Sequence, residues 1–292
     1  MAQSVHLRHR AEAAAAGLPP LLVAAERVAS TVAQGVHGRR RVGLGETFWQ
    51  FRQYAPGDPA QRIDWRESAK TQRLYVREME WEAAQSVYLW RDTSPSMNYA
   101  SDRELPTKRA RADLLTLALA ALLLRGGERT TFLGSGVPPS HGRAVLDRMA
   151  LDIERAGAGL SLPGFEPLPR HAHLVLIGDL LAPLADIHAL VARFAASGLK
   201  GHLLQVLDPT EETLPFAGRV RFEGLEQEAP IVIGRVETVR EAYIERLARH
   251  RDGLAAIARA TQWSFGTHRT DRPPHTALLA LYTALAPEPG RR

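Results

Sequence analysis

The sequence contains no cysteine, which excludes disulfide bonds, thiolate metal sites and cysteine nucleophiles. It also lacks a long hydrophobic run: the longest, residues 114–124, falls short of the roughly 20 residues that a membrane-spanning helix needs. The start carries arginines but no apolar stretch with a cleavage site, so we expect no signal peptide. We therefore expect a cytoplasmic protein, at most peripheral to a membrane.

A strong charge bias is missing as well. Lys and Arg number 37 and Asp and Glu 32, which leaves a net charge of +5. This mild excess is compatible with acidic partners, but no basic stripe is interleaved with aromatic residues as in nucleic-acid binders. We expect no nucleic-acid partner, and Arg39, Arg40 and Arg41 in a glycine-rich stretch keep that function open only as a weak alternative.

Residues 86–98 combine a predicted strand with a polar loop. The first half is rich in β-branched and aromatic residues, which indicates a buried strand ending near Asp92. Asp92, Ser94 and Ser96 then follow in the pattern D-x-S-x-S. A carboxylate and two hydroxyls are hard oxygen ligands, suited to Mg²⁺ or Mn²⁺ rather than zinc. The alternative is a Ser/Pro turn in which Asp92 only caps the next helix.

A second predicted strand, residues 174–178, is wholly apolar and ends in Asp179. Continuous apolar runs are typical of parallel strands covered on both faces. Ligands of such sheets bind beyond the carboxyl ends of the strands. We therefore expect Asp92 and Asp179 to lie at one edge of the sheet and to share one cation. As an alternative, Asp179 only caps a helix beginning near Pro183.

Residues 46–80 gather aromatic residues and arginines. Arginine stacks on aromatic rings and binds carboxylates in a fork. We therefore expect a half-buried network of arginine, aspartate and tryptophan, with Asp58 and Asp64 as partners for Arg52, Arg62 or Arg66. Alternating residues predict a strand over 74–81. The segment is too apolar to stay in water, and we expect it to pack on the main domain.

The order F-W-x-F-R-x-Y-x-P-G-D, R-I-D-W-R-x-S-A and L-x-V-R-E, followed by D-x-S-x-S, resembles family 58 of the domains of unknown function. The resemblance is strongest over residues 43–98. Two positions differ from the family pattern, because Pro59 replaces a second acid and Gln61 replaces an arginine. The signature positions in this chain are Arg52, Gly57, Asp58, Arg62, Asp64, Trp65 and Arg66.

The D-x-S-x-S loop is itself similar to the metal-ion-dependent adhesion site of von Willebrand factor A domains. The resemblance implies an α/β, von Willebrand factor A-like (Rossmann-type) fold, in which a mainly parallel sheet has helices on both faces. It implies that Asp179 is the third-loop ligand. The second loop normally supplies a threonine, but residues 157–169 contain none, and Ser161 is the substitute. Weak or absent metal binding is therefore an alternative.

The resemblance also implies partners. Families of this kind are linked with MoxR-type AAA+ ATPases and with other von Willebrand A-domain proteins, which implies an adaptor in a chaperone-like or maturation complex. The chain has no phosphate-cradling G-x-x-x-x-G-K-[ST] loop, so nucleotide hydrolysis would have to come from the partner.

The remaining patterns complete the predicted organisation. Residues 1–42 hold an N-terminal helix beginning at Pro20 and a basic linker, and residues 43–80 form the signature segment. Residues 81–286 form the A-like domain, and residues 287–292 are a disordered tail. Within the main domain we expect helices over 107–125, 144–156 and 238–260 and a β-hairpin insertion over 219–233.

Three functions of different class remain open. The first, which we favour, is a non-enzymatic interaction module in which Asp92, Ser94, Ser96 and Asp179 hold a metal whose open position accepts a partner's carboxylate. The second is a metal-dependent phosphohydrolase using Asp92, but its usual D-x-D motif places a general acid where Ser94 stands. The third, the basic nucleic-acid binder, rests on charge alone. We expect no enzymatic activity.

Overall fold

The computed structural model describes residues 20–35, 42–43, 47–55, 58, 61, 63–70, 73–80, 84–226 and 228–285. The chain forms two compact units, one of residues 1–35 with 85–292 and one of residues 36–84. Several predicted features lie outside the described residues: the arginines of the basic linker (Arg39, Arg40 and Arg41), the signature residues Gly57 and Arg62, the divergent Pro59, and the tail 287–292.

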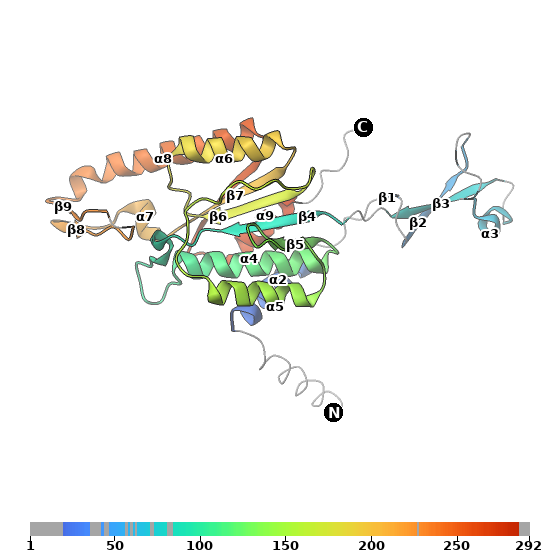
Figure 1. The fold of residues 1–292 in the computed structure, drawn as a ribbon, viewed down its shortest axis with the longest axis horizontal. Coiled ribbons are helices and arrows are strands. Elements are labelled where there is room, and N and C mark those ends of the chain that lie inside the picture. Colours follow the sequence, from blue (N-terminus) through green and yellow to red (C-terminus); the bar gives the residue numbers. More distant parts are fainter. Residues whose placement is uncertain are drawn as a thin grey trace, which may run out of the picture. The chain divides into compact units, whose positions relative to one another are not determined.

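The larger unit is built on a five-stranded sheet. Its strands are β4 (Ser86–Arg91), β5 (Arg129–Phe132), β6 (His173–Gly178), β7 (Lys200–Leu207) and β10 (Ser264–Arg269), in the spatial order β10-β7-β6-β4-β5. Every neighbouring pair is parallel (Figure 1). The carboxyl ends of all five strands therefore face one edge, which is where ligands bind in sheets of this type.

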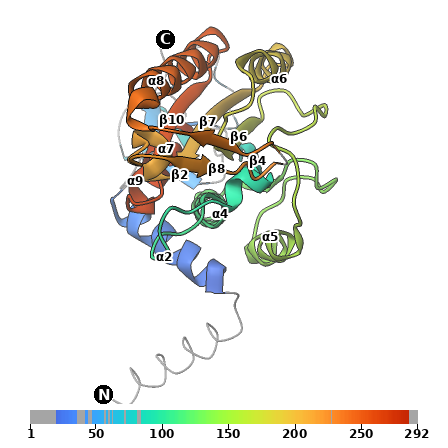
Figure 2. The same cartoon turned by 90° about the vertical axis from the view of Figure 1, so that its left-hand side faces the viewer.

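Helices cover both faces of the sheet. Helices α6 (Leu184–Ala196) and α8 (Glu237–Ala260) lie on one face, and α4 (Lys108–Arg125), α5 (Arg143–Arg155) and α9 (Pro274–Leu285) on the other (Figure 2). Helix α4 is buried at 13 of its 18 residues, as its apolar residues on all sides predict. The sequence patterns do not predict α9.

The N-terminal helix α2 (Pro20–Gly35) packs on the main domain, as expected. It contacts α4, α5 and α9 and buries Ala25, Ala29 and Val32. Pro20 stands at its first position, where the missing N–H costs no hydrogen bond.

Short elements crowd the carboxyl edge of the sheet. They are the 3₁₀ turn η2 (Pro95–Asn98), helix α7 (Pro209–Thr213) and the antiparallel hairpin of β8 (Val220–Phe222) and β9 (Ile231–Ile233) (Figure 1). The predicted fold class is therefore confirmed, including the hairpin insertion. None of the helices in the described ranges is long and apolar enough to cross a membrane.

The smaller unit contains an antiparallel sheet of β1 (Val42–Gly43), β2 (Thr47–Gln53) and β3 (Tyr75–Glu80), in the order β1-β3-β2, and a single helical turn α3 (Trp65–Ser68). Both terminal nitrogens of Arg52 donate to the carboxylate of Asp58: Nη1 donates to Oδ2 at 3.0 Å and Nη2 to Oδ1 at 2.9 Å. Asp64 caps α3 by accepting a hydrogen bond from the Glu67 N–H at 2.9 Å.

The expectation that Trp65 belongs to a half-buried network is wrong, because its side chain is 66% exposed. It begins a one-turn helix whose buried position is Ser68, so the tryptophan and Arg66 face outward. That this unit packs on the larger one stays a prediction.

Candidate functional site

Two adjacent parallel strands place Asp92 and Asp179 at the carboxyl edge. Asp92 follows β4, and its N–H donates to the Ile177 carbonyl of β6 at 2.8 Å. Asp179 follows β6, and both aspartates are almost fully buried. A Cβ added at Gly178 would lie 2.6 Å from the Cβ of Asp92, so glycine is what permits this approach.

The D-x-S-x-S loop joins the two carboxylates through a line of hydrogen bonds. The hydroxyl of Ser94 donates to Asp92 Oδ1 at 2.6 Å and lies 3.0 Å from the hydroxyl of Ser96. Ser96 in turn donates to Asp179 Oδ2 at 2.8 Å. The structure thus brings together four of the five predicted metal ligands, and their role in binding a metal stays a prediction.

Neither aspartate caps a helix, so both capping alternatives are wrong. The turn η2 begins after Ser94, helix α4 after Thr107 and helix α6 after Pro183. The carboxylates instead hold their own loops, because Asp92 accepts the Ser94 N–H at 2.8 Å and Asp179 accepts the Leu181 N–H at 3.2 Å.

Ser161, the fifth predicted ligand, lies half-buried in the loop after α5. This loop reaches the site, since the Gly159 N–H donates to the Thr93 carbonyl at 2.9 Å. Within residues 84–226, no hydrogen bond joins Ser161 to either aspartate. Its role as a substitute for the missing threonine also stays a prediction.

Two charged residues that the sequence patterns missed complete the site. Lys108 is the first residue of α4 and only 1% exposed, and its Nζ donates to Asp179 Oδ2 at 3.0 Å and to Glu211 Oε1 at 2.6 Å. Glu211 belongs to α7, directly after strand β7. The capping-box pattern D-x-x-E of Asp208 and Glu211 was the signal that could have located it.

Burial dominates the electrostatics of the cluster. It raises the pKa of Asp92 to about 6, helped by the negative charge of Asp179 and opposed by the hydrogen bonds from Ser94. Burial also raises the pKa of Glu211 against the attraction of Lys108. Burial lowers the pKa of Lys108, but Asp179 and Glu211 outweigh it, so the pKa is raised and the ammonium stays charged.

The donor set fits a hard divalent cation in part. Asp92 Oδ2 is buried and has no hydrogen-bond partner among the described residues, and the neighbouring oxygens are of the kind that Mg²⁺ and Mn²⁺ prefer. No three histidine, aspartate or glutamate side chains gather to hold a metal in the described part of the chain, so hydroxyls would have to contribute. The ammonium of Lys108 already donates a hydrogen bond to one of these oxygens, Asp179 Oδ2.

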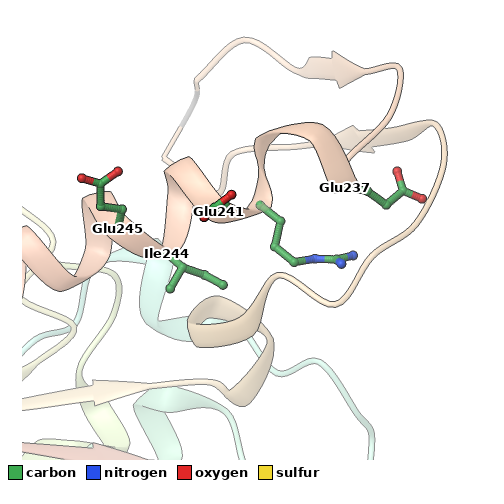
Figure 3. Close-up of a pocket in the computed structure, with 5 residues that line it drawn as sticks. Glu237, Glu241, Ile244 and Glu245 are labelled. Atoms are coloured by element: carbon green, nitrogen blue, oxygen red, sulfur yellow. The ribbon is translucent and has the colours of Figure 1, made fainter.

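A separate pocket of about 440 Å³ lies on helix α8 (Figure 3). Its lining comes from this one helix: Glu237, Arg240, Glu241, Ile244 and Glu245. The guanidinium of Arg240 is engaged by the carbonyls of Leu214 and Phe216, at 2.9 and 2.7 Å. Because Arg240 is the only cation that lines it among the described residues and is bound to backbone carbonyls, this pocket is a weaker candidate than the cluster at the sheet edge.

Curated mycobacterial proteins are similar to this chain in sequence. The uncharacterized proteins Rv1480 of Mycobacterium tuberculosis and Mb1516 of Mycobacterium bovis are each 26% identical to this chain over 277 residues. These matches cover 88% of this chain and 85% of the relative.

Two solved structures are also similar. One is an aerotolerance-related membrane protein from Bacteroides fragilis, with 15% identity and a TM-score of 0.41 over 69% of this chain and 98% of that one. The other is the conserved hypothetical protein BatB from Bacteroides thetaiotaomicron, with 14% identity and a TM-score of 0.40 over 68% and 98%.

The model of one family, described as "Protein of unknown function DUF58", matches residues 50–253, well over half of the sequence. This match confirms the resemblance seen in the signature segment, and the chain belongs to this family.

Proposed function

We propose that this protein is a non-enzymatic interaction module that binds a MoxR-type AAA+ ATPase in the cytoplasm through the cluster at the carboxyl edge of its sheet. Its role would be that of an adaptor in a chaperone-like or maturation complex, in which other von Willebrand A-domain proteins are further candidate partners. The observation that carries the proposal is the convergence of Asp92, Ser94, Ser96 and Asp179 from two strand ends.

The cluster has the features of a binding site rather than of a packing defect. A buried carboxylate oxygen without a partner among the described residues, such as Asp92 Oδ2, costs free energy, and a bound ion is one explanation for its retention. Perturbed pKa values, as at Asp92, also gather at functional sites. The surrounding loops follow different strands and helices. A partner that contacts all of them would therefore recognise the arrangement of this edge of the sheet.

One source of the positive charge that meets the partner would be a Mg²⁺ or Mn²⁺ ion held by Asp92, Ser94, Ser96 and Asp179. Such an ion supplies an open coordination position that accepts a carboxylate from outside the chain. Lys108 offers a second source of positive charge at the same oxygens. In either case the partner contributes an acidic side chain.

No observation favours the phosphohydrolase. Asp92 could act as a nucleophile only with an acid to protonate the leaving group. Position 94 supplies a serine hydroxyl instead, and this hydroxyl is already committed to Asp92 Oδ1. We therefore expect neither phosphatase nor ATPase activity from the purified chain.

The test is a binding titration of a purified MoxR-type AAA+ ATPase against the wild type and the Asp92→Ala variant. We expect the variant to bind at least about tenfold more weakly, a change of about 1.4 kcal/mol, because the loop of Ser94 loses its acceptor. Repeating the titration with Mg²⁺ and with EDTA separates a metal-bridged contact from one that Lys108 carries.

Asp152→Ala is the matched control, because Asp152 is an exposed aspartate on helix α5. Circular dichroism should first confirm that both variants are folded. Equal affinity of the wild type and Asp92→Ala in every condition would show that the cluster is not the binding surface.

A further inference from the structure

Lysine is rare in this chain, and one lysine is placed where lysine is least expected. Of the 37 basic residues only Lys70, Lys108 and Lys200 are lysines, which leaves 37 − 3 = 34 arginines. Lys70 and Lys200 are exposed, whereas Lys108 is 1% exposed. An ammonium taken out of water is costly unless it is paired, so this position calls for a specific reason.

The position is unfavourable for a cation in a second way. Lys108 is the first residue of α4, and the start of a helix carries a partial positive charge that repels cations. The carboxylates of Asp179 and Glu211 offset both costs, at 3.0 and 2.6 Å from Nζ. The side chain of Lys108 is thus held by the acidic cluster rather than by its own helix.

The ammonium also occupies the coordination sphere that a metal would need. Its Nζ and the hydroxyl of Ser96 both donate to the same oxygen, Asp179 Oδ2. A divalent ion bound through that oxygen would have to displace Nζ or sit beside a like charge. A compact ammonium is the side-chain group that comes closest to a small metal ion, whereas the planar guanidinium used elsewhere in the chain is not.

We propose that Lys108 is the resident cation of the cluster and excludes Mg²⁺ and Mn²⁺ from it. This inference rests on the site of the proposed function but not on its partner. The loop of Asp92, Ser94 and Ser96 then keeps its shape without metal. A metal binds there only when the ammonium has been removed.

The experiment is a Mn²⁺ titration followed by electron paramagnetic resonance of the free ion. We expect Lys108→Met to bind one Mn²⁺ at least tenfold more tightly than the wild type, and Lys200→Met to match the wild type. Adding Asp92→Asn to Lys108→Met should remove the gained affinity, which places the ion at this cluster. Equal Mn²⁺ affinity of the wild type and Lys108→Met would overturn the inference.

A second measurement needs no variant and holds even if Lys108→Met fails to fold. The wild type is treated with an amine-acetylating reagent, with and without Mg²⁺, and the three lysines are quantified by mass spectrometry. We expect Lys108 to stay protected in both samples while Lys70 and Lys200 are acetylated. Acetylation of Lys108 that appears on adding Mg²⁺ would show that the metal displaces it, and would also overturn the inference.

The two proposals fail in different ways. Loss of the expected Mn²⁺ gain with normal binding to the ATPase would refute only the role of Lys108. The expected Mn²⁺ gain without any binding to the ATPase would refute only the proposed partner.

Discussion

Gly178 controls how closely the two site-forming strands approach. The Cβ of an alanine there would lie 2.6 Å from the Cβ of Asp92 and 3.0 Å from its Oδ2. Both atoms belong to a side chain that is fully buried and fixed by Ser94. The clash therefore has to be relieved by moving the Asp92 loop or strand β6.

We predict that Gly178→Ala lowers the free energy of unfolding by about 1–3 kcal/mol, the usual cost of overpacking a dense interior. Urea denaturation followed by circular dichroism measures the change. Gly157→Ala is the matched control, because a Cβ at Gly157 meets no atom within 4 Å. A variant as stable as the wild type would mean that the loop can shift freely.

At this scale the sequence located the aspartates and the serines but not the two residues that face them. Asp92 and Asp179 were predictable because each follows an apolar strand, and parallel strands end at one edge. Lys108 lies 71 positions from Asp179 and 103 from Glu211. Contacts of that range leave no local pattern, and only the packing of α4 under the sheet brings them together.

At the scale of single elements, strand β7 carries a histidine that the fold keeps neutral. His202 is 4% exposed, and burial lowers its pKa to about 4. Its Nδ1 lies 2.7 Å from the Ser264 hydroxyl of the neighbouring strand. In the unfolded chain the same imidazole titrates near pH 6.5.

We predict that His202 makes the free energy of unfolding fall as the pH is lowered from about 6.5 toward 4. In that window His202 binds a proton in the unfolded state but not in the folded state, so lowering the pH favours unfolding. Between pH 7.5 and 5 the loss from His202 should be about 2 kcal/mol. Urea titrations at both pH values measure it.

His202→Gln should show a smaller loss over the same range, and His141→Gln, which changes an exposed histidine, should behave as the wild type. His268, whose pKa burial also lowers to about 4, keeps part of the dependence in the variant. An unchanged pH dependence in His202→Gln would contradict the assignment.

Elements were predictable where their pattern was long and consistent. The run that forms α4 is apolar all round, and the observed helix buries it on all sides. Helix α7 has only five residues, too few for a periodic pattern, although its capping box marks its start. The prediction for Trp65 failed because composition does not show which face of a single turn is buried.

At the scale of the whole molecule, the larger unit is made of two separate stretches of the chain, residues 1–35 and 85–292, and the smaller unit lies between them in the sequence. Helix α2 packs on α4 and α9, although residues 36–84 form a compact unit between them in the sequence. The predicted boundaries of the signature segment, 43–80, fall inside this unit. The predicted bounds rest on composition, because the aromatic residues and arginines of the segment differ from the glycine-rich sequence that precedes it.

The smaller unit leaves apolar side chains uncovered by its own sheet. Trp65 is 66% exposed and Leu74 43%. Apolar side chains gathered in one small unit are typical of surfaces that another part of the protein covers. Its loops are nevertheless well tied, since Asp58 accepts hydrogen bonds from Arg52 and from the Ala55 N–H at 2.8 Å.

We therefore predict that limited trypsin digestion spares this unit in the full chain, although arginine is frequent there. Cleavage needs a local stretch of extended, accessible backbone, and packing against the larger unit would deny it after Arg52, Arg66 and Lys70. Mass spectrometry of timed samples identifies the fragments. A peptide of residues 36–84 is the control, and its sites should be cut faster than the same sites in the full chain.

Rapid cleavage at these sites while the parallel sheet stays folded, as judged by circular dichroism, would show that the signature unit does not pack on the main domain. Its exposed tryptophan and leucine would then be free for a partner, and the search for the binding surface would move there from the carboxyl edge of the sheet.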